Sequence, residues 1–576
     1  VVIIVPTIAL MDETRRRLYK KFSRDYGIIT APDVPLEARN ILIFPQERAF
    51  GYINKLKKID LLVIDEFYKA SIVNDKERAP SLIKAIVQLS RRAEQRYYLA
   101  PNIKKLADNV FTRDMEFLEL LNFNTVFLEK HEVYKEIGGD EKKKSEALLS
   151  IISPRNEKSL VYAGTYAEIK KIADLVVDRM SKVDRVHTSH FARWLRENYQ
   201  ESWVLADLVE RGVGVHNGRM HRCLSQLQVV LFEHEKGFDS IVSTSSIIEG
   251  VNTSAQNVVI WKSKLGRNNL TDFTYKNIIG RGGRMFKHFV GHIYLLDSPP
   301  KDEDTQLKIE FPDTVLGGLD EIQDCENLNE HQIEKIIEYK LQMSDIVGVE
   351  NFARIMRDNL LQDSDADFLL QIAGDMKNNP EDWKGFGYLN SSNPSDWDRM
   401  LYKVIALKPS GWDASFKRVV AVVKALASNW TTDIPAMLRQ LSGSGIDIEG
   451  FFQLERTITF KLSALLSDIN ELHKMIVNPS VDIVGFIGKV SHAFLPPAVH
   501  NLEEYGLPRM ISRKLHMAHF IDFSHADLDL KSTLNLFRRN GLEVALRVET
   551  LTAFDRYILR FFFNGITPDD VAAIPT

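Results

Sequence analysis

The sequence has few cysteines and no long apolar run. Cys223 and Cys325 are the only cysteines among 576 residues, which excludes a disulfide framework and a zinc site made of cysteines alone, and fits a reducing interior. Neither a run of about 18 apolar residues nor a signal peptide is present, so we expect a cytoplasmic protein without membrane contact. The net charge of −4 excludes an overall field that attracts nucleic acid, so such binding needs a local basic surface.

The sequence also lacks a phosphate-binding loop. No Gly-x-x-x-x-Gly-Lys-Ser/Thr string occurs, so the residues that cradle nucleotide phosphates in many ATPases are not found in it. The chain opens at Val1 inside an apolar run without an initiator methionine. We therefore expect that further residues precede it.

Alternating apolar and amphipathic segments predict an α/β fold with a helical end. A chain of this length exceeds one core and indicates three or four domains. Alternation of short apolar runs with helical periods is typical of parallel α/β layers. Strands are expected at 1–5, 41–44, 61–64, 97–100, 159–163, 239–244, 257–261 and 292–296, and helices at 12–22, 81–93 and 166–180. A charged stretch at 138–144 predicts a hinge, which gives domains at 1–137, 138–320 and 321–576.

Two strings carry most of the chemical information. Leu-Leu-Val-Ile-Asp-Glu at 61–66 is an apolar run that ends in two carboxylates, which a sheet places at the carboxyl edge of a buried strand. Gly-Arg-Gly-Gly-Arg at 280–284 sets two guanidinium groups three residues apart, on one face of a helical turn. Acids that hold a metal and arginines that stabilise a transferring phosphoryl group are the two halves of a nucleotide hydrolase.

With the strings between them, these segments resemble superfamily 2 nucleic-acid helicases (DEAD/DEAH-box motors) of the superkiller-like branch. The likeness covers roughly residues 1–300; the best match is Ser-Thr-Ser-Ser-Ile-Ile-Glu-Gly-Val-Asn at 243–252. It implies two RecA-like P-loop NTPase lobes, the first truncated so that it lacks its Walker A segment. A mostly α-helical accessory region of winged-helix and helical-bundle type follows them. ATP and Mg²⁺ are the implied cofactors.

The resemblance assigns an ATP site. Asp65 is expected to hold Mg²⁺ through water and Glu66 to polarise the attacking water, while Arg281 and Arg284 reach the γ-phosphate across the cleft. Gly282 and Gly283 are expected to let the backbone approach the other lobe. The further ATP-binding positions are Gly250, Asn252, Asn277 and Gly280. Solvated acids at a strand end and a surface arginine turn are the simpler readings.

Two departures from the family pattern concern the coupling of hydrolysis to strand movement. Tyr68 replaces the polar residue that ends the acidic box, and Leu-Ala-Pro-Asn at 99–102 stands where relatives show Ser-Ala-Thr. The hydroxyl groups that couple hydrolysis to strand movement are therefore missing. We expect Tyr68 and Asn102 to substitute for them and to communicate.

Other strings match the segments that grip nucleic acid in this family. Helix starts and backbone amides bind phosphates there, and simple helix capping explains some of these positions equally well. The candidates are Pro6, Thr7, Gln46, Arg48, Thr165, His216, Asn217 and Thr244. Basic residues of the helix after Thr7 could add electrostatic hold, or form a solvated face. Residues 262–274 are either a strand-separating hairpin turned at Gly266 or a plain loop.

The C-terminal third has no recognisable catalytic string. Arg509 and Arg513 share a helical face, which predicts either a solvated helix, the favoured reading, or a contact with a strand or partner. Glu-Glu-Tyr-Gly-Leu-Pro-Arg at 503–509, with the acidic box, is similar to the helicase subunit of Hachiman-type bacterial anti-phage systems. That likeness implies a small nuclease partner, restrained until abnormal DNA is met.

The expected function is ATP-driven translocation on single-stranded or partly duplex nucleic acid, with unwinding. DNA and 3′-to-5′ movement are favoured by resemblance alone, and RNA stays an alternative. A helicase-like scaffold that binds DNA and gates a partner with little or no hydrolysis is the rival from another class. Sequence leaves open the Walker A residues, the polarity, the partner's identity and stoichiometry, and the role of the helical region.

Overall fold

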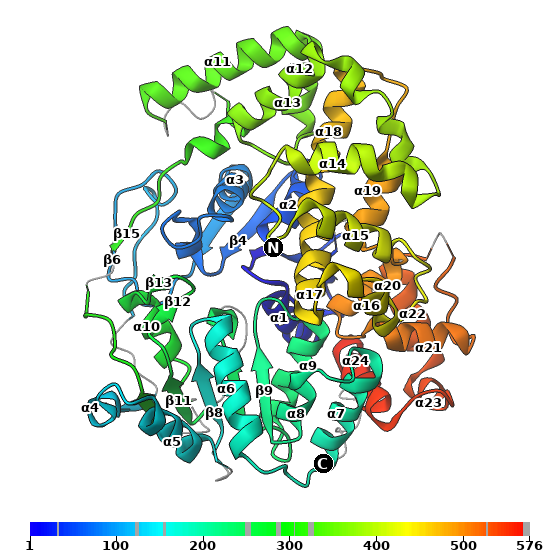
Figure 1. Cartoon of the computed structure of the whole chain (residues 1–576). Helices are drawn as coiled ribbons and strands as arrows, with labels where there is room; N and C mark the ends of the chain where they lie inside the picture. Colours follow the sequence, from blue (N-terminus) through cyan, green and yellow to red (C-terminus); the bar gives the residue numbers. More distant parts are fainter. Residues whose placement is uncertain are drawn as a thin grey trace.

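The computed structural model describes residues 1–31, 34–120, 126–153, 157–247, 255–283, 290–303, 306–320, 328–525 and 528–567, with the side chain of residue 247 excepted. Three parts are visible in Figure 1: two parallel sheets with helices around them, and a helical region that runs along the first sheet toward the second. We call the parts the first unit (residues 1–106 with 306–319), the second unit (126–297) and the helical region (329–567).

The first unit contains a five-stranded parallel sheet in the order β2-β3-β1-β4-β5. Its central strands are short apolar runs because helices cover both faces of such a sheet. The strands are β1 (Val2–Ile4), β2 (Gly27–Ile29), β3 (Asn40–Phe44), β4 (Ile59–Ile64) and β5 (Ala93–Tyr98); the helices are α1 (Ile8–Phe22), α2 (Gln46–Ile53) and α3 (Ala79–Ser90). The short parallel pair of β6 (Lys105–Leu106) and β15 (Gln306–Leu307) returns the chain to this unit, where residues 307–319 complete its core.

The second unit contains a six-stranded parallel sheet in the order β7-β14-β11-β8-β10-β9. Its strands are β7 (Phe127–His131), β8 (Ser159–Tyr162), β9 (Val213–His216), β10 (Ser240–Ser243), β11 (Asn257–Ile260) and β14 (Val290–Leu295). Its helices are α4 (Tyr134–Ile137), α5 (Glu141–Ile152), α6 (Tyr166–Arg179), α7 (Val186–Asn198), α8 (Val204–Val209), α9 (Arg222–Glu233) and α10 (Asp272–Ile279). The predicted mixed α/β class with parallel sheets is confirmed.

Several boundaries differ from expectation. The strand expected at 97–100 runs instead from 93 to 98, and β7 and β9 were not predicted. β7 pairs with β14, so the second sheet begins about ten residues before the expected boundary at 137/138. The physical reason is that β7 is an edge strand whose residues are partly exposed, so it does not form an apolar run.

In its described residues the helical region contains α-helices, short 3₁₀ helices and one π-helical turn, joined by turns and loops, and no strand. Its helices are α11 (Glu330–Val347), α12 (Val349–Asp358), α13 (Ala366–Asn378), α14 (Asp398–Ala406), α15 (Phe416–Leu426), α16 (Ile434–Gln440), α17 (Ile448–Thr457), α18 (Ser463–Ile476), α19 (Val484–Ser491), α20 (Pro497–Glu504), α21 (Arg509–Met517), α22 (Leu530–Asn540), α23 (Leu542–Leu546) and α24 (Ala553–Ile566). A π-helical turn at Ile458–Leu462 joins α17 to α18. Among the described helices, none has the length and apolar content that crossing a bilayer requires.

The two ends of the helical region contact different parts of the molecule. α11 and α13 pack on the 3₁₀ turn Asp313–Gly318, which itself packs on α3 of the first unit. At the other end, α20 contacts α1 and α9, and α24 contacts α1 and α7. These elements lie side by side near the centre of Figure 1, where the first and second units meet.

Candidate active site

The two carboxylates of the acidic box lie at the carboxyl end of β4. The Asp65 amide continues the sheet by donating to the Ile4 carbonyl over 2.9 Å, and one Asp65 oxygen accepts from the Glu66 amide over 2.9 Å. Glu66 has a φ of 56°, in the left-handed region that costs a non-glycine residue on the order of 1 kcal/mol or more. Strained residues of this kind concentrate at functional sites, because surrounding contacts must hold them in place.

The charge of Arg281 acts on both carboxylates across the junction between the units. Burial raises the pKa of Asp65, while the Glu66 amide and the Arg281 charge oppose the rise. Burial and the neighbouring Asp65 charge raise the pKa of Glu66, and a Tyr68 hydrogen bond and Arg281 oppose it. Paired carboxylate oxygens whose ionisation is disfavoured by burial fit a divalent cation, which supplies the missing positive charge.

The two departures from the family pattern both contact α10 of the second unit. Asn102 donates from Nδ2 to Oδ1 of Asn277 over 2.5 Å, although 175 residues separate them. The Tyr68 ring meets the Phe273 ring edge to face, with 4.7 Å between ring centroids. Because positions i and i+4 share one helix face, α10 presents both contacts to the first unit together.

The arginine turn is held within the second unit. Gly280 ends α10, and an isolated parallel bridge joins Gly282 to Ala255. A Cβ on Gly282 would lie 2.8 Å from Ile293 Cδ1, and one on Gly283, whose φ is 72°, would lie 2.3 Å from Val126 Cγ1. The close neighbours of these two glycines are thus strands and linker of their own unit, and the expectation that they let the backbone approach the first unit stays a prediction.

Three candidate residues cannot be placed. Arg284, Gly250 and Asn252 lie outside the described residues, together with the second half (248–252) of the string at 243–252. Their roles remain predictions from resemblance.

In the first unit, two expected segments meet around Arg78, which precedes α3. Arg78 donates to the Pro6 carbonyl and binds both carboxylate oxygens of Glu47 at 2.9 Å each. Thr7 caps α1 by accepting from the Leu10 amide over 3.2 Å. Pro6 and Thr7 stay candidates for phosphate contact, and the Thr7 hydroxyl also caps α1.

Gln46 and Arg48 lie at the start of α2, and both are largely buried. Gln46 has 3% of its surface exposed. Arg48 donates to the Thr30 carbonyl over 3.0 Å and forms an ion pair with Glu504 of the helical region. Its guanidinium is therefore engaged by protein in this structure, and nucleic-acid contact by Arg48 requires that pair to open.

The second unit places its candidates at the carboxyl ends of three neighbouring strands, β8, β10 and β9. Thr165 caps α6 by accepting from the Glu168 amide over 3.1 Å. His216 is buried, which lowers its pKa to about 4, and its Nδ1 lies 2.9 Å from the Ser246 hydroxyl. Asn217 accepts from the Arg219 amide over 2.9 Å, and Thr244 donates its amide to the His216 carbonyl over 3.3 Å.

The segment at 262–274 contains a hairpin. β12 (Lys264–Leu265) and β13 (Asn268–Asn269) pair antiparallel, and Gly266 turns between them with a φ of 60°. The plain-loop alternative is excluded for these residues. Strand separation by the hairpin stays a prediction.

The string at 503–509 contains Glu504, which binds an arginine of each unit; we call these contacts the interlock at Glu504. One carboxylate oxygen of Glu504 accepts from Arg48 of the first unit and, over 2.7 Å, from Arg222 of the second. Burial alone would raise the pKa of Glu504, but these two guanidinium groups hold it at about 2. A buried carboxylate that binds two partly buried guanidinium groups joins three parts of the molecule at one atom.

A second buried network lies beside it on α1. Asp12 binds Arg15 at 2.5 Å and Arg16 at 2.7 Å. Arg15 also donates to the Gly565 carbonyl over 2.8 Å, and Arg16 donates to the Tyr505 carbonyl over 3.0 Å. Part of the basic face of α1 is therefore used to dock the helical region instead of facing solvent.

The favoured reading of Arg509 and Arg513 as a solvated helix is wrong. Arg509 is buried and binds Glu503 at 2.7 Å and Glu455 at 2.5 Å. Arg513 donates to the Thr431 carbonyl over 2.9 Å. The sequence showed that the two arginines share a face, but the face is covered by α17 and its neighbours.

Sequence reasoning missed the partners that make these contacts. Glu504, Arg222 and Asp12 occur in ordinary amphipathic helices, and no local pattern reveals which charge is buried. The string at 503–509 was interpreted as a family likeness and as a turn before a basic helix, and neither interpretation predicts its buried ion pairs. A usable signal was its three charged residues and Tyr505 around Gly506, a glycine whose φ of 88° fits a tight turn between α20 and α21.

No family model matches the chain. A comparison with curated proteins finds it similar to anti-bacteriophage protein B of Escherichia coli (strain K12), with 30% identity over 378 residues. The aligned part covers 63% of this chain and 51% of that protein. The chain thus spans about half the length of the curated relative it matches.

Proposed function

We propose that the chain is the motor part of an ATP-driven translocase on single-stranded nucleic acid, with DNA favoured, that acts in defence against bacteriophage. The observation that carries the motor is the approach of Arg281 on the second unit to Asp65 and Glu66 on the first. Acids on one unit, with an arginine of another unit near enough for its charge to act on them, are the arrangement that phosphoryl transfer uses. The similarity to anti-bacteriophage protein B supports the defence role.

In this proposal each residue has a distinct task. Asp65 would hold Mg²⁺ through water, and the ion would neutralise phosphate charge. Glu66 orients the attacking water from a backbone position fixed by Asp65, and Arg281 stabilises charge on the transferring group. Asn102 and Tyr68, through α10, transmit the relative position of the two units.

The test is ATP hydrolysis by the full-length protein with and without single-stranded DNA or RNA. A motor predicts strong stimulation by the strand it follows, and a loss of at least about 10³-fold in turnover for Arg281→Ala, the scale of arginine fingers. Arg179→Ala is a matched control at an exposed ion pair of the second unit, expected to keep most of the rate. An Arg281→Ala variant that hydrolyses ATP like the parent refutes the finger role.

A second candidate is a helicase-like scaffold that binds DNA and gates a nuclease partner. The interlock at Glu504 favours it, because buried ion pairs hold both units in one relative orientation. A scaffold predicts strand binding with no strand-stimulated hydrolysis. The same ATPase measurement therefore separates the two proposals, and binding to labelled DNA and RNA identifies the strand.

A further inference from the structure

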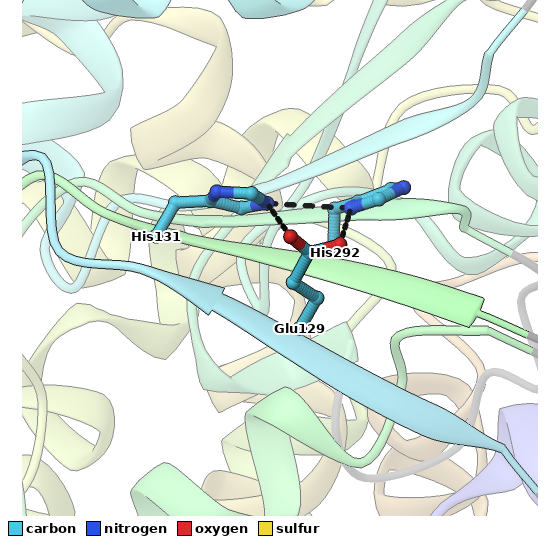
Figure 2. A group of neighbouring side chains, drawn as sticks. All are labelled: Glu129, His131 and His292. Carbon is cyan, nitrogen blue, oxygen red and sulfur yellow. Dashed lines mark hydrogen bonds and ion pairs between the residues drawn. The ribbon is translucent and has the colours of Figure 1, made fainter.

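Two histidines and a glutamate converge on one face of the second sheet, on its edge strand β7 and the neighbouring β14. Glu129 and His131 are two residues apart on β7, so both side chains project to the same face of the sheet. His292 of β14 pairs in register with Glu129, and His131 pairs with Tyr294. Figure 2 shows the two imidazole rings and the carboxylate turned toward one another above the paired strands.

The separations of the three donor groups match those around a tetrahedral metal ion. His131 Nε2 lies 3.3 Å from His292 Nδ1, and the Glu129 oxygens lie 3.3 Å from His292 Nδ1 and 3.9 Å from His131 Nε2. Bonds of about 2.0–2.2 Å in a tetrahedron place ligand atoms roughly 3.4 Å apart. A single ion can therefore bind all three with side-chain shifts of a few tenths of an ångström.

We propose that Glu129, His131 and His292 form a binding site for a divalent transition metal, with zinc as the best fit. Two imidazoles with one carboxylate are a common zinc ligand set, and they leave a fourth position for water. The proposal is independent of the motor function.

The surroundings leave these donor atoms accessible to a cation and hold one of the rings in place. Among the described residues, Glu129 forms ion pairs with the two histidines and with no lysine or arginine. The carboxylate is half exposed and the rings are about one-third exposed or less, so an ion can reach them from solvent. The His131 ring also stacks on Tyr294, with centroids 4.7 Å apart, which limits its rotation and orients Nε2.

Another group of possible metal ligands in the described part of the chain does not have accessible, unprotonated donor atoms. His221, Cys223 and Glu503 lie within ligand distance of one another. However, His221 binds Glu455, Glu503 binds Arg509, and Cys223 is buried, which raises its thiol pKa to about 12. Its donors are already paired or protonated, so we do not assign it.

A bound ion would cross-link β7 to β14 at the edge of the sheet. β7 is the first strand after the chain leaves the first unit, and the arginine turn directly precedes β14. Metal binding therefore stabilises the place where the linker between the units joins the second sheet.

The experiment uses the full-length, tag-free protein treated with chelator and titrated calorimetrically with Zn²⁺, then with Co²⁺ while visible absorption reports tetrahedral coordination. We expect one ion per chain in wild type. Glu129→Gln, His131→Gln and His292→Gln should each weaken binding at least about tenfold. Each should also lose the zinc-dependent rise in the thermal unfolding midpoint that wild type shows.

The control is the double variant His187→Gln/His234→Gln, which removes a histidine pair of the same unit with ring centroids 5.0 Å apart. It should bind zinc like wild type. The site is refuted if wild type shows no saturable binding at millimolar zinc. It is refuted equally if the three ligand variants keep wild-type affinity, or if the control loses as much affinity as they do. Unfolding midpoints without zinc confirm that each variant is folded.

Discussion

The two contacts of α10 with the first unit, Tyr68 with Phe273 and Asn102 with Asn277, should be energetically coupled. Tyr68→Leu removes the ring contact with Phe273, which is worth about 0.5–1.5 kcal/mol. Asn102→Ala removes the hydrogen bond with Asn277, worth about 0.5–1.5 kcal/mol net. Together they represent about 1–3 kcal/mol of docking energy, or roughly a 5- to 150-fold change in the ratio of docked to undocked α10.

The double variant should cost less than the sum of the single ones, by about 0.5–2 kcal/mol, because losing either contact loosens the helix that makes the other. Hydrogen exchange of peptides covering residues 272–279 measures the docking without any assumption about catalysis. The strand-stimulated ATPase rate provides a second readout. Tyr68→Phe, which keeps the ring and removes the hydroxyl group, controls for the bond to Glu66. Effects that add within about 0.3–0.5 kcal/mol in both assays refute the coupling.

Two further predictions concern buried charge. Asp12→Ala leaves Arg15 and Arg16 without their shared carboxylate and should lower the free energy of unfolding by about 3–5 kcal/mol. Glu13→Ala, at an exposed ion pair on the same helix, should change it by less than about 0.5 kcal/mol. Denaturant midpoints measure both variants, and equal effects would contradict the buried network. Burial raises the pKa of Asp468 to about 7, so its stabilising contribution is complete below the unfolded-state value near 4 and is lost as the pH rises through 7. Relative to Asp468→Asn, wild type should lose on the order of 3–4 kcal/mol between pH 4 and 8, and parallel pH profiles of the thermal midpoint would contradict this.

The sequence predicted the elements whose signals are local. The β1, β3, β4 and β8 strands appear as apolar runs because they lie inside the sheets, with β3 and β8 almost wholly buried and β1 and β4 partly so. Thr7 and Thr165 mark the starts of α1 and α6 as side-chain caps. It did not predict β7, whose residues alternate at a half-exposed edge. Short apolar runs were sufficient for the interior of each sheet and insufficient for its margin.

The candidate site was predictable only in part. The resemblance predicted that Asp65, Glu66 and Arg281 share one site, and in the structure the charge of Arg281 opposes the rise in the pKa of both acids. The burial of Arg48 was not predictable, because its partner Glu504 lies 456 residues away and each occurs in an unremarkable helix. The identity of a long-range charge pair depends on the packing of whole units, which no local spacing encodes.

The shared oxygen of Glu504 has a consequence for motion. Arg48 and Arg222 belong to different units, so any rotation of one unit against the other pulls the two guanidinium groups apart, and the carboxylate can follow only one of them. The helix that carries it, α20, must then travel with that unit. Opening of the junction and displacement of the C-terminal helices are therefore a single mechanical event.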